Sequence, residues 1–472
     1  MFSKSTDAKR TVPTVTSAML RHKATGDAVY LALIETVVFS ALYAMYHSFM
    51  VNNPLIFGDY GFYNLNGSYL HLLSAFAPWT NVYAKFIYTL TPKTYGYFWN
   101  VTLIYSSLLP PVGMYFLLKK LEFGITARAL ASIFYGLNPI SLTNVFGYEY
   151  ASVLFFLPII IMFLIEYNKN NRATSLITAI VITTIFTEIY GLSQIKMVAP
   201  FMIGALLIPL SNPFHKKFHS LIKDYGLAAT IFLVLSSIQI AAAFHLFTQY
   251  SNNFGLSSGA VALQELDSAK FVFSANNVMN SLSGLLLYPT TISSNLGYGH
   301  SWFGAIWLFV IFVCIVSVIL YKGPRKHFYN MLLILILIFI GFEYGIYNVT
   351  LLFLFYRIPL VNLYNSPIFF NVMLSFIYAV FFAQFAETFE QQTTLHISLL
   401  PRSKRRITRR ITKISAIIII AGLLITPSVP ILLHPYGILS TSPDNLTMPS
   451  YFEKIVSFFS TRQDARVLIF TQ

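Results

Sequence analysis

The stretch from Ser301 to Lys326 reads SWFGAIWLFVIFVCIVSVILYKGPRK, and it decides the fold class. Its first part, 301–321, carries no charged side chain, and about 20 apolar residues in a helix cross the hydrocarbon core of a bilayer. Lys322, Arg325 and Lys326 follow at once, as is typical of the cytoplasmic end of a membrane helix. The stretch therefore predicts one transmembrane helix and its direction.

Apolar runs of the same kind recur along the chain and predict an all-α polytopic membrane protein with about eleven transmembrane helices. They lie near 28–51, 100–118, 127–145, 150–167, 173–191, 197–211, 225–247, 301–321, 328–346, 367–386 and 412–431. Asn138-Pro139 should break the third of them, because proline cannot continue a regular helix. Every second segment between the runs is rich in Lys and Arg, and the segments between those are poor in them. Because cytoplasmic segments carry the excess of basic residues, this pattern predicts a cytoplasmic N-terminus and an outer C-terminus. Of the 31 Lys and Arg, the predicted outer side holds only Lys85, Lys93, Lys196, Lys270, Arg357, Lys454, Arg462 and Arg466.

The composition agrees with a membrane protein and argues against a nucleic-acid partner. Hydrophobic residues make up 56% of the chain and charged residues 10%, whereas soluble domains carry about 25% charged residues. The net charge of +14 is spread between apolar runs rather than along one surface, so membrane topology explains it better. The single cysteine, Cys314, permits no disulfide within the chain.

The predicted organisation is a cytoplasmic segment at 1–27, a membrane domain at 28–431 and an outer segment at 432–472. Two outer loops, 52–99 and 248–301, are unusually long, and the first contains two amphipathic stretches typical of interfacial helices, near 65–76 and 82–90. A multi-pass protein of the plasma membrane is expected. The last residues resemble a strand without a neighbour, which suggests an outer domain completed by a protein partner.

The most suggestive site motif is Phe57-Gly-Asp59-Tyr60-Gly, directly after the first predicted helix. A carboxylate in a glycine-flanked loop could deprotonate an acceptor hydroxyl or hold a divalent cation. The same letters also describe an ordinary turn. Glu149, in a short outer loop, is a second acid or a solvated loop residue. The ten histidines show no metal-ligand spacing, so no metal site is predicted and any cofactor stays unknown.

Several outer residues could bind a lipid phosphate or a sugar. Arg357, before Pro359, is the best candidate for gripping phosphate, and Lys85 and Lys196 are weaker candidates. All three could instead extend toward the interface as snorkelling cations. Two motifs could offer hydroxyl, amide and aromatic groups to a sugar: the one that contains Tyr364 and Asn365, and the one around His300. Both could instead be residues that form turns and start helices.

The order of these features resembles the GT-C superfamily of membrane glycosyltransferases, which has a long outer loop with an acid after the first helix and another after the seventh. Three shorter motifs are similar to an arabinofuranosyltransferase-like branch of that superfamily: Ala129-Leu-Ala-Ser-Ile-Phe-Tyr-Gly-Leu-Asn-Pro139, Tyr364-Asn-Ser-Pro367, and Pro449-Ser-Tyr-Phe followed by Arg466-Val-Leu. The resemblance implies that Asp59 is the catalytic base or metal-side acid and that Glu149 is a second acid.

The leading hypothesis is transfer of a sugar from a polyprenyl-phosphate donor to an acceptor on the outer face. Two alternatives from other classes stay open. A transporter or lipid flippase needs polar groups near the bilayer centre, of which Glu35 is the clear example. A non-catalytic scaffold of an outer assembly would explain the strand-like end of the tail.

Overall fold

The computed structural model describes residues 26–42, 109–144, 148–190, 218–237, 302–345 and 368–398, and single positions between 415 and 432. Every secondary-structure element in these ranges is a helix, and none of them is a strand. The predicted all-α class is therefore confirmed for these ranges. The count of eleven helices stays a prediction, because the run at 197–211 lies outside them. The interfacial stretches, both long loops and nearly all of the tail also lie outside the described residues.

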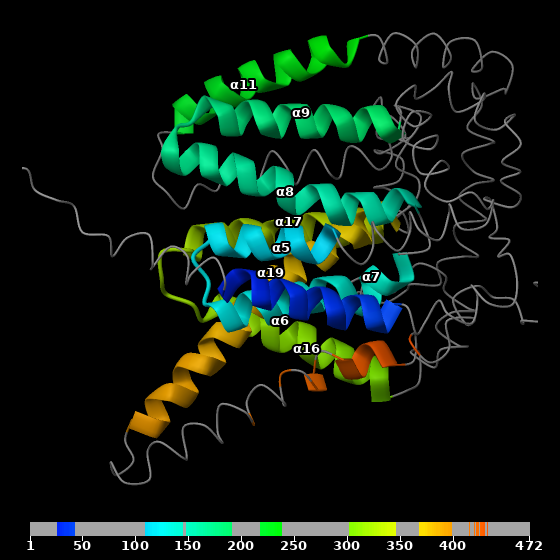
Figure 1. Cartoon of the computed structure of the whole chain (residues 1–472), viewed down its shortest axis with the longest axis vertical. Coiled ribbons are helices and arrows are strands. Elements are labelled where there is room, and N and C mark those ends of the chain that lie inside the picture. The colour runs from blue at the N-terminus through cyan, green and yellow to red at the C-terminus, as the bar shows by residue number, and fades with distance from the viewer. Residues whose placement is uncertain are drawn as a thin grey trace, which may run out of the picture.

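The described helices are side by side in one bundle (Figure 1). After the helix at 26–42, their bounds are α5 (Leu109–Lys120), α6 (Ile125–Leu137), α7 (Pro139–Asn144), α8 (Tyr148–Asn170), α9 (Ala173–Tyr190), α11 (Phe218–Leu235), α16 (Trp302–Ile319), α17 (Lys326–Gly345) and α19 (Ile368–Ser398), with a 3-10 turn η5 (Thr426–Ser428). Four of them, α8, α9, α16 and α17, begin and end within about three residues of a predicted apolar run, which is close to the spread between assignment methods.

Two predicted boundaries are wrong. Helix α19 continues to Ser398, beyond the predicted apolar run at 367–386, and α11 begins at Phe218 instead of 225. Both extensions are polar helical turns, and an apolar run ends where the polar turns begin even though the helix goes on. Hydropathy therefore located the apolar part of each helix and not its end.

The predicted break at Asn138-Pro139 is confirmed, so the run at 127–145 forms two helices rather than one. Helix α6 ends at Leu137, and Asn138 has the extended conformation, with φ −69° and ψ 156°. A residue before proline is pushed toward this conformation by the proline ring. Pro139 then starts the six-residue α7, where its missing N–H is not needed.

Helix α19 is the centre of the bundle. Every residue from Met373 to Ala383 is buried, and the helix packs against α6, α7, α8, α16 and α17. Phe382 stacks on Phe134 of α6 with ring centroids 4.5 Å apart, and Trp307 of α16 lies 5.8 Å beyond Phe134. Such ring pairs contribute about 0.5–1.5 kcal/mol each beyond the area they bury. Aromatic packing thus joins three helices that are distant in the sequence.

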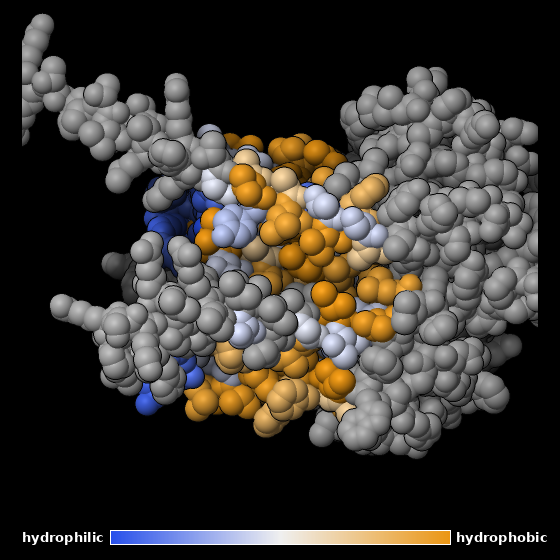
Figure 2. Space-filling model, turned by 60° about the horizontal axis from the view of Figure 1, so that its bottom comes forward, coloured by the Kyte–Doolittle hydropathy of each residue, from blue (hydrophilic) through white to orange (hydrophobic). Residues whose placement is uncertain are grey.

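Large apolar side chains are also exposed on the outside of the bundle. On α9 the exposed residues Ile177, Val181 and Ile185 recur at every fourth position and form one face, while Phe312 of α16 and Leu337 of α17 are 63% and 70% exposed. Figure 2 shows apolar residues covering the middle of the visible surface, with hydrophilic residues gathered at one end. Contiguous apolar surface of this kind marks contact with a membrane or another protein.

By length and hydropathy together, one helix in the described ranges could cross a membrane, through Val153–Asn170 of α8. Three shorter apolar helices lie at Ala173–Ile185, Gly304–Ile319 and Lys326–Ile340.

We expect Gly136 to be essential for close packing of three segments. A Cβ at this position would lie 3.1 Å from Pro111 Cγ and 3.1 Å from Val38 Cγ1, whereas a Cβ at Gly226 of α11 would meet nothing within 4 Å. Gly136→Leu should therefore overpack the contact and lower the free energy of unfolding by about 1–3 kcal/mol. Gly226→Leu should stabilise the helix by up to about 1 kcal/mol. Thermal unfolding in detergent measures both, and equal midpoints for the two variants would contradict this packing.

Candidate functional site

The predicted outer site is almost entirely outside the described residues. Eight of its nine residues lie there: Asp59, Tyr60, Lys85, Lys196, His300, Arg357, Tyr364 and Asn365. The ninth, Glu149, is the second residue of α8 rather than part of a loop. The geometry of the predicted site therefore stays a prediction. The described polar groups of interest are two clusters and one isolated carboxyl group.

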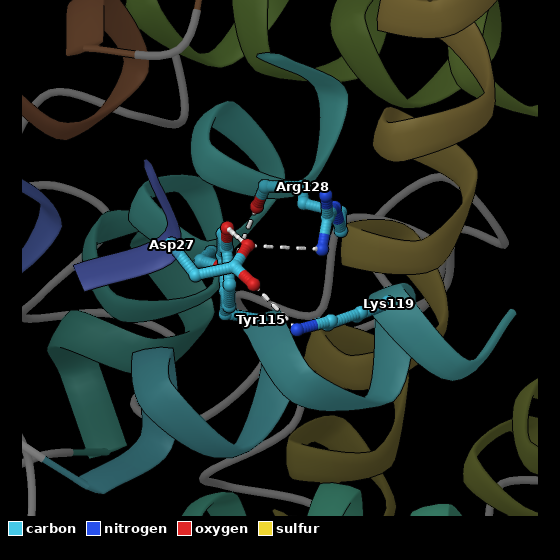
Figure 3. A network of polar contacts seen from close by, with 5 residues as sticks. Asp27, Tyr115, Lys119 and Arg128 are labelled. Carbon is cyan, nitrogen blue, oxygen red and sulfur yellow. Dashed lines mark hydrogen bonds and ion pairs between the residues drawn. The ribbon is translucent and has the colours of Figure 1, made fainter. Parts of the chain in front are cut away.

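The first cluster surrounds Asp27 at the start of the helix 26–42 (Figure 3). Its carboxylate accepts a hydrogen bond from the Tyr115 hydroxyl at 2.6 Å and an ion-paired hydrogen bond from Lys119. Arg128 Nη1 of α6 lies 3.5 Å from Asp27 Oδ1 and its guanidinium lies 5.0 Å from the Tyr115 ring centroid. One carboxylate therefore ties together three helices, and its side chain is 15% exposed.

A tight turn between α5 and α6 makes this cluster possible. The Phe123 N–H donates to the Leu118 carbonyl and the Glu122 N–H to the Lys119 carbonyl, with Glu122 in the left-handed region at φ 65°. These are the two bonds of a Schellman motif, which ends a helix and reverses the chain. The basic last turn of α5 and the first turn of α6 are thus brought to the same end of the bundle.

Glu387 of α19 forms a second junction at this end. Its Oε1 accepts a 3.1 Å hydrogen bond from the Gly124 N–H at the start of α6, and its Oε2 pairs with Arg325 Nη2 at 2.5 Å. The Arg325 guanidinium lies 4.0 Å from the Phe123 ring centroid. Glu387 therefore caps one helix and holds the connection between α16 and α17, with both ionic side chains 14% exposed.

Further pairs close the same end around α8. Lys120 of α5 lies 2.8 Å from Glu166, and Lys169 pairs with Glu122 of the turn. The Tyr225 hydroxyl of α11 donates to Asn168 Oδ1 at 2.9 Å. We name the Asp27, Glu387 and α8 contacts together the charged end. The carboxylates of Asp27, Glu122, Glu166 and Glu387 all pair with cations. The charged end therefore joins helices and does not have the character of an acid–base site.

The second cluster is buried at the break between α6 and α7. Asn138 Nδ2 donates to the Phe134 carbonyl at 2.9 Å and lies 3.0 Å from Ser141 Oγ and 2.9 Å from Ser375 Oγ of α19. Ser141 N–H donates back to Asn138 Oδ1 at 3.0 Å. Because helix breaks free backbone groups that need partners, this cluster replaces lost helical hydrogen bonds. It fixes the direction of α7 and presents no free reactive group.

The third feature is Glu35, in the middle of the helix 26–42. Both carboxyl oxygens are buried, and neither has a hydrogen-bond partner among the described residues. The sequence analysis singled out Glu35 as a polar group in a predicted membrane helix. It did not predict the charged end, whose paired residues are far apart in the chain. The described residues contain no group of three or more His, Cys, Asp or Glu side chains that could hold a metal ion.

Comparison with known proteins leaves the family open. No protein-family model matches the sequence, and no curated protein matches it. A solved structure that is similar is the oligosaccharyltransferase of Archaeoglobus fulgidus, tethered through a disulfide bond to an acceptor peptide containing the NVT sequon. The identity is 13% and the TM-score 0.43, over 92% of this chain and 53% of that chain, so this chain spans about half the length of that protein.

We expect Asp27 to stabilise the fold in a pH-dependent way. Burial raises the pKa of Asp27, but the hydrogen bonds and positive charges of its partners outweigh this and lower it below 3.8. A lowered pKa gives stability that is complete above the ordinary value and is lost as the pH falls through the folded-state value. Asp27→Asn should therefore unfold more easily at neutral pH, by about 1–3 kcal/mol, with less further loss on acidification.

The measurement is the thermal unfolding midpoint in detergent between neutral pH and about pH 3. Glu122→Gln is the control, because that side chain is 67% exposed and an exposed pair contributes only about 0–1 kcal/mol. If both variants lowered the midpoint equally at neutral pH, the Asp27 contacts would stabilise the fold no more than an exposed ion pair does, and the prediction would be wrong.

Proposed function

We propose that this protein is a multi-pass membrane glycosyltransferase that takes a sugar from a polyprenyl-phosphate donor and acts at the bundle end opposite the charged end. The observation that carries the proposal is the common direction of the helices. The helix 26–42 starts at the charged end and α5 finishes there, so residues 42 and 109, which flank the segment with Asp59, both lie toward the other end. Helix α11 also starts near the charged end, and α16 finishes near Arg325, so the described residues that flank the predicted loop 248–301 lie toward the other end as well.

Two described features support a membrane setting for this chemistry. The exposed apolar side chains of α9, α16 and α17 suit lipid contact along the length of the bundle. The charged end collects the lysines and arginines around residues 119–128, 166–172 and 322–326, as expected of a cytoplasmic face. The opposite end would then face outward, where the sequence resemblance requires the reaction.

The proposed reaction is an inverting displacement at the anomeric carbon of the donor sugar. Asp59 removes the proton of an acceptor hydroxyl, the hydroxyl oxygen bonds to the anomeric carbon, and the bond to the phosphate oxygen breaks. Polyprenyl phosphate departs, held by Arg357 and Lys85. Tyr60, Tyr364, Asn365 and His300 line the sugar site in this proposal. Lys196 is a further cation for the phosphate, and Glu149 is the second acid.

Cysteine labelling tests the orientation. Cys314 is buried, with 1% of its surface exposed, so the natural chain reacts little with a polar maleimide and serves as the background. Glu122→Cys, at the charged end, should react with a membrane-impermeant maleimide only after the cells are opened. Asp267→Cys, in the loop 248–301, should react on intact cells. The reverse labelling pattern, or equal labelling of both, would refute the orientation.

Substitution of Asp59 tests the chemistry. Loss of a general base lowers the rate by about 10²–10⁴-fold, so Asp59→Asn should lose sugar transfer by about that factor while its expression and unfolding midpoint stay unchanged. The assay uses membranes and a panel of polyprenyl-phosphate monosaccharides labelled in the sugar.

Asp267→Asn is the matched control, an acid-to-amide change in the other long loop, and should keep its activity. Unchanged transfer in the Asp59 variant would remove Asp59 from the mechanism. If wild-type membranes moved no sugar from any donor in the panel, the scaffold alternative would gain instead.

A further inference from the structure

Glu35 occupies a place in the bundle that the proposed transfer reaction does not use. It lies eight residues beyond Asp27, which corresponds to about 12 Å along a helix axis. Ile34, Val38 and Leu42 on the same helix are fully buried, and Val38 points at Gly136 of α6. Glu35 is three positions before Val38, so the two side chains are neighbours on one side of the helix. The buried carboxyl group of Glu35 is therefore on the side of the helix that contacts α6.

The charged groups of these three helices are already engaged elsewhere. Lys119 and Arg128 pair with Asp27, and Lys120 pairs with Glu166. Their other titratable groups are tyrosines. Tyr115 donates its hydroxyl proton to Asp27 and Tyr135 donates to the Leu154 carbonyl. Tyr30 is five positions before Glu35, which places it about 140° around the helix. No cation from these helices therefore pairs with Glu35.

We infer that Glu35 is a proton-binding site, held as the neutral carboxylic acid between the helix 26–42 and the α5–α6 pair. An ionised carboxylate without a partner is far more costly in apolar surroundings than the neutral acid. Loss of the proton would favour entry of water or a cation, and so separation of these helices. Membrane-embedded acids of this kind are functional by default. The inference stands independently of the glycosyltransferase proposal.

Infrared difference spectroscopy of the full chain in lipid tests the protonation state directly. Subtracting the spectrum of Glu35→Gln from that of the wild type, at neutral and mildly acidic pH, should leave the carbonyl band of one protonated carboxyl group. The matched control is Glu166→Gln, since Glu166 is paired with Lys120 at 2.8 Å and 16% exposed. That difference should show a carboxylate band. A carboxylate band for Glu35 as well would overturn the inference.

Chemical labelling of the wild-type protein gives a second test that requires no folded variant. Apolar dicyclohexylcarbodiimide adds the O–H of a protonated carboxyl across one of its N=C bonds, and the adduct rearranges to an acylurea of the same composition. Peptide mass spectrometry should find this adduct on Glu35, with a yield that falls as the pH rises. A water-soluble carbodiimide should label exposed Glu122 instead. Labelling of Glu35 by the water-soluble reagent alone would show a group that is open to water and would refute the inference.

Discussion

Charge pairing at a single end is the constraint on which the described bundle depends. Asp27 and Glu166 bind cations from other helices, and Glu387 binds Arg325 of the connection between α16 and α17. With the ends fixed there, the apolar lengths of α5, α6, α8 and α19 are held side by side, and aromatic packing can form between them. The remaining surface of these helices is then free to be apolar on the outside as well as inside.

The sequence predicted the helices in which hydropathy and helix length coincide. Helices α8, α9, α16 and α17 have this property, and so their ends were found within a few residues. The polar end of α19, around Glu387, lies outside any apolar run and was missed, although its residues favour a helix. The break at Pro139 was predictable because its cause is local and steric.

The candidate site was predictable only as residue types in outer segments. Roles for Asp59 and Arg357 followed from local motifs and from a family resemblance, and sequence gives no distance between such residues. The charged end was not predictable for the same reason, since Asp27 and Arg128 are 101 positions apart. The contact between Ser375 and Asn138 is a second example. Pro139 predicted that the helix breaks, but the sequence did not indicate that α19 supplies a hydrogen-bond partner at the break.

The Glu387 contact also affects the order of assembly during synthesis. The Gly124 N–H that it caps was made 263 residues earlier, so α6 leaves the ribosome long before its cap exists. Until α19 is made, Arg325 also lacks the carboxylate of Glu387. This end of the bundle can therefore be completed only after α19 has been synthesised, which makes the packing of α19 the step that closes the bundle.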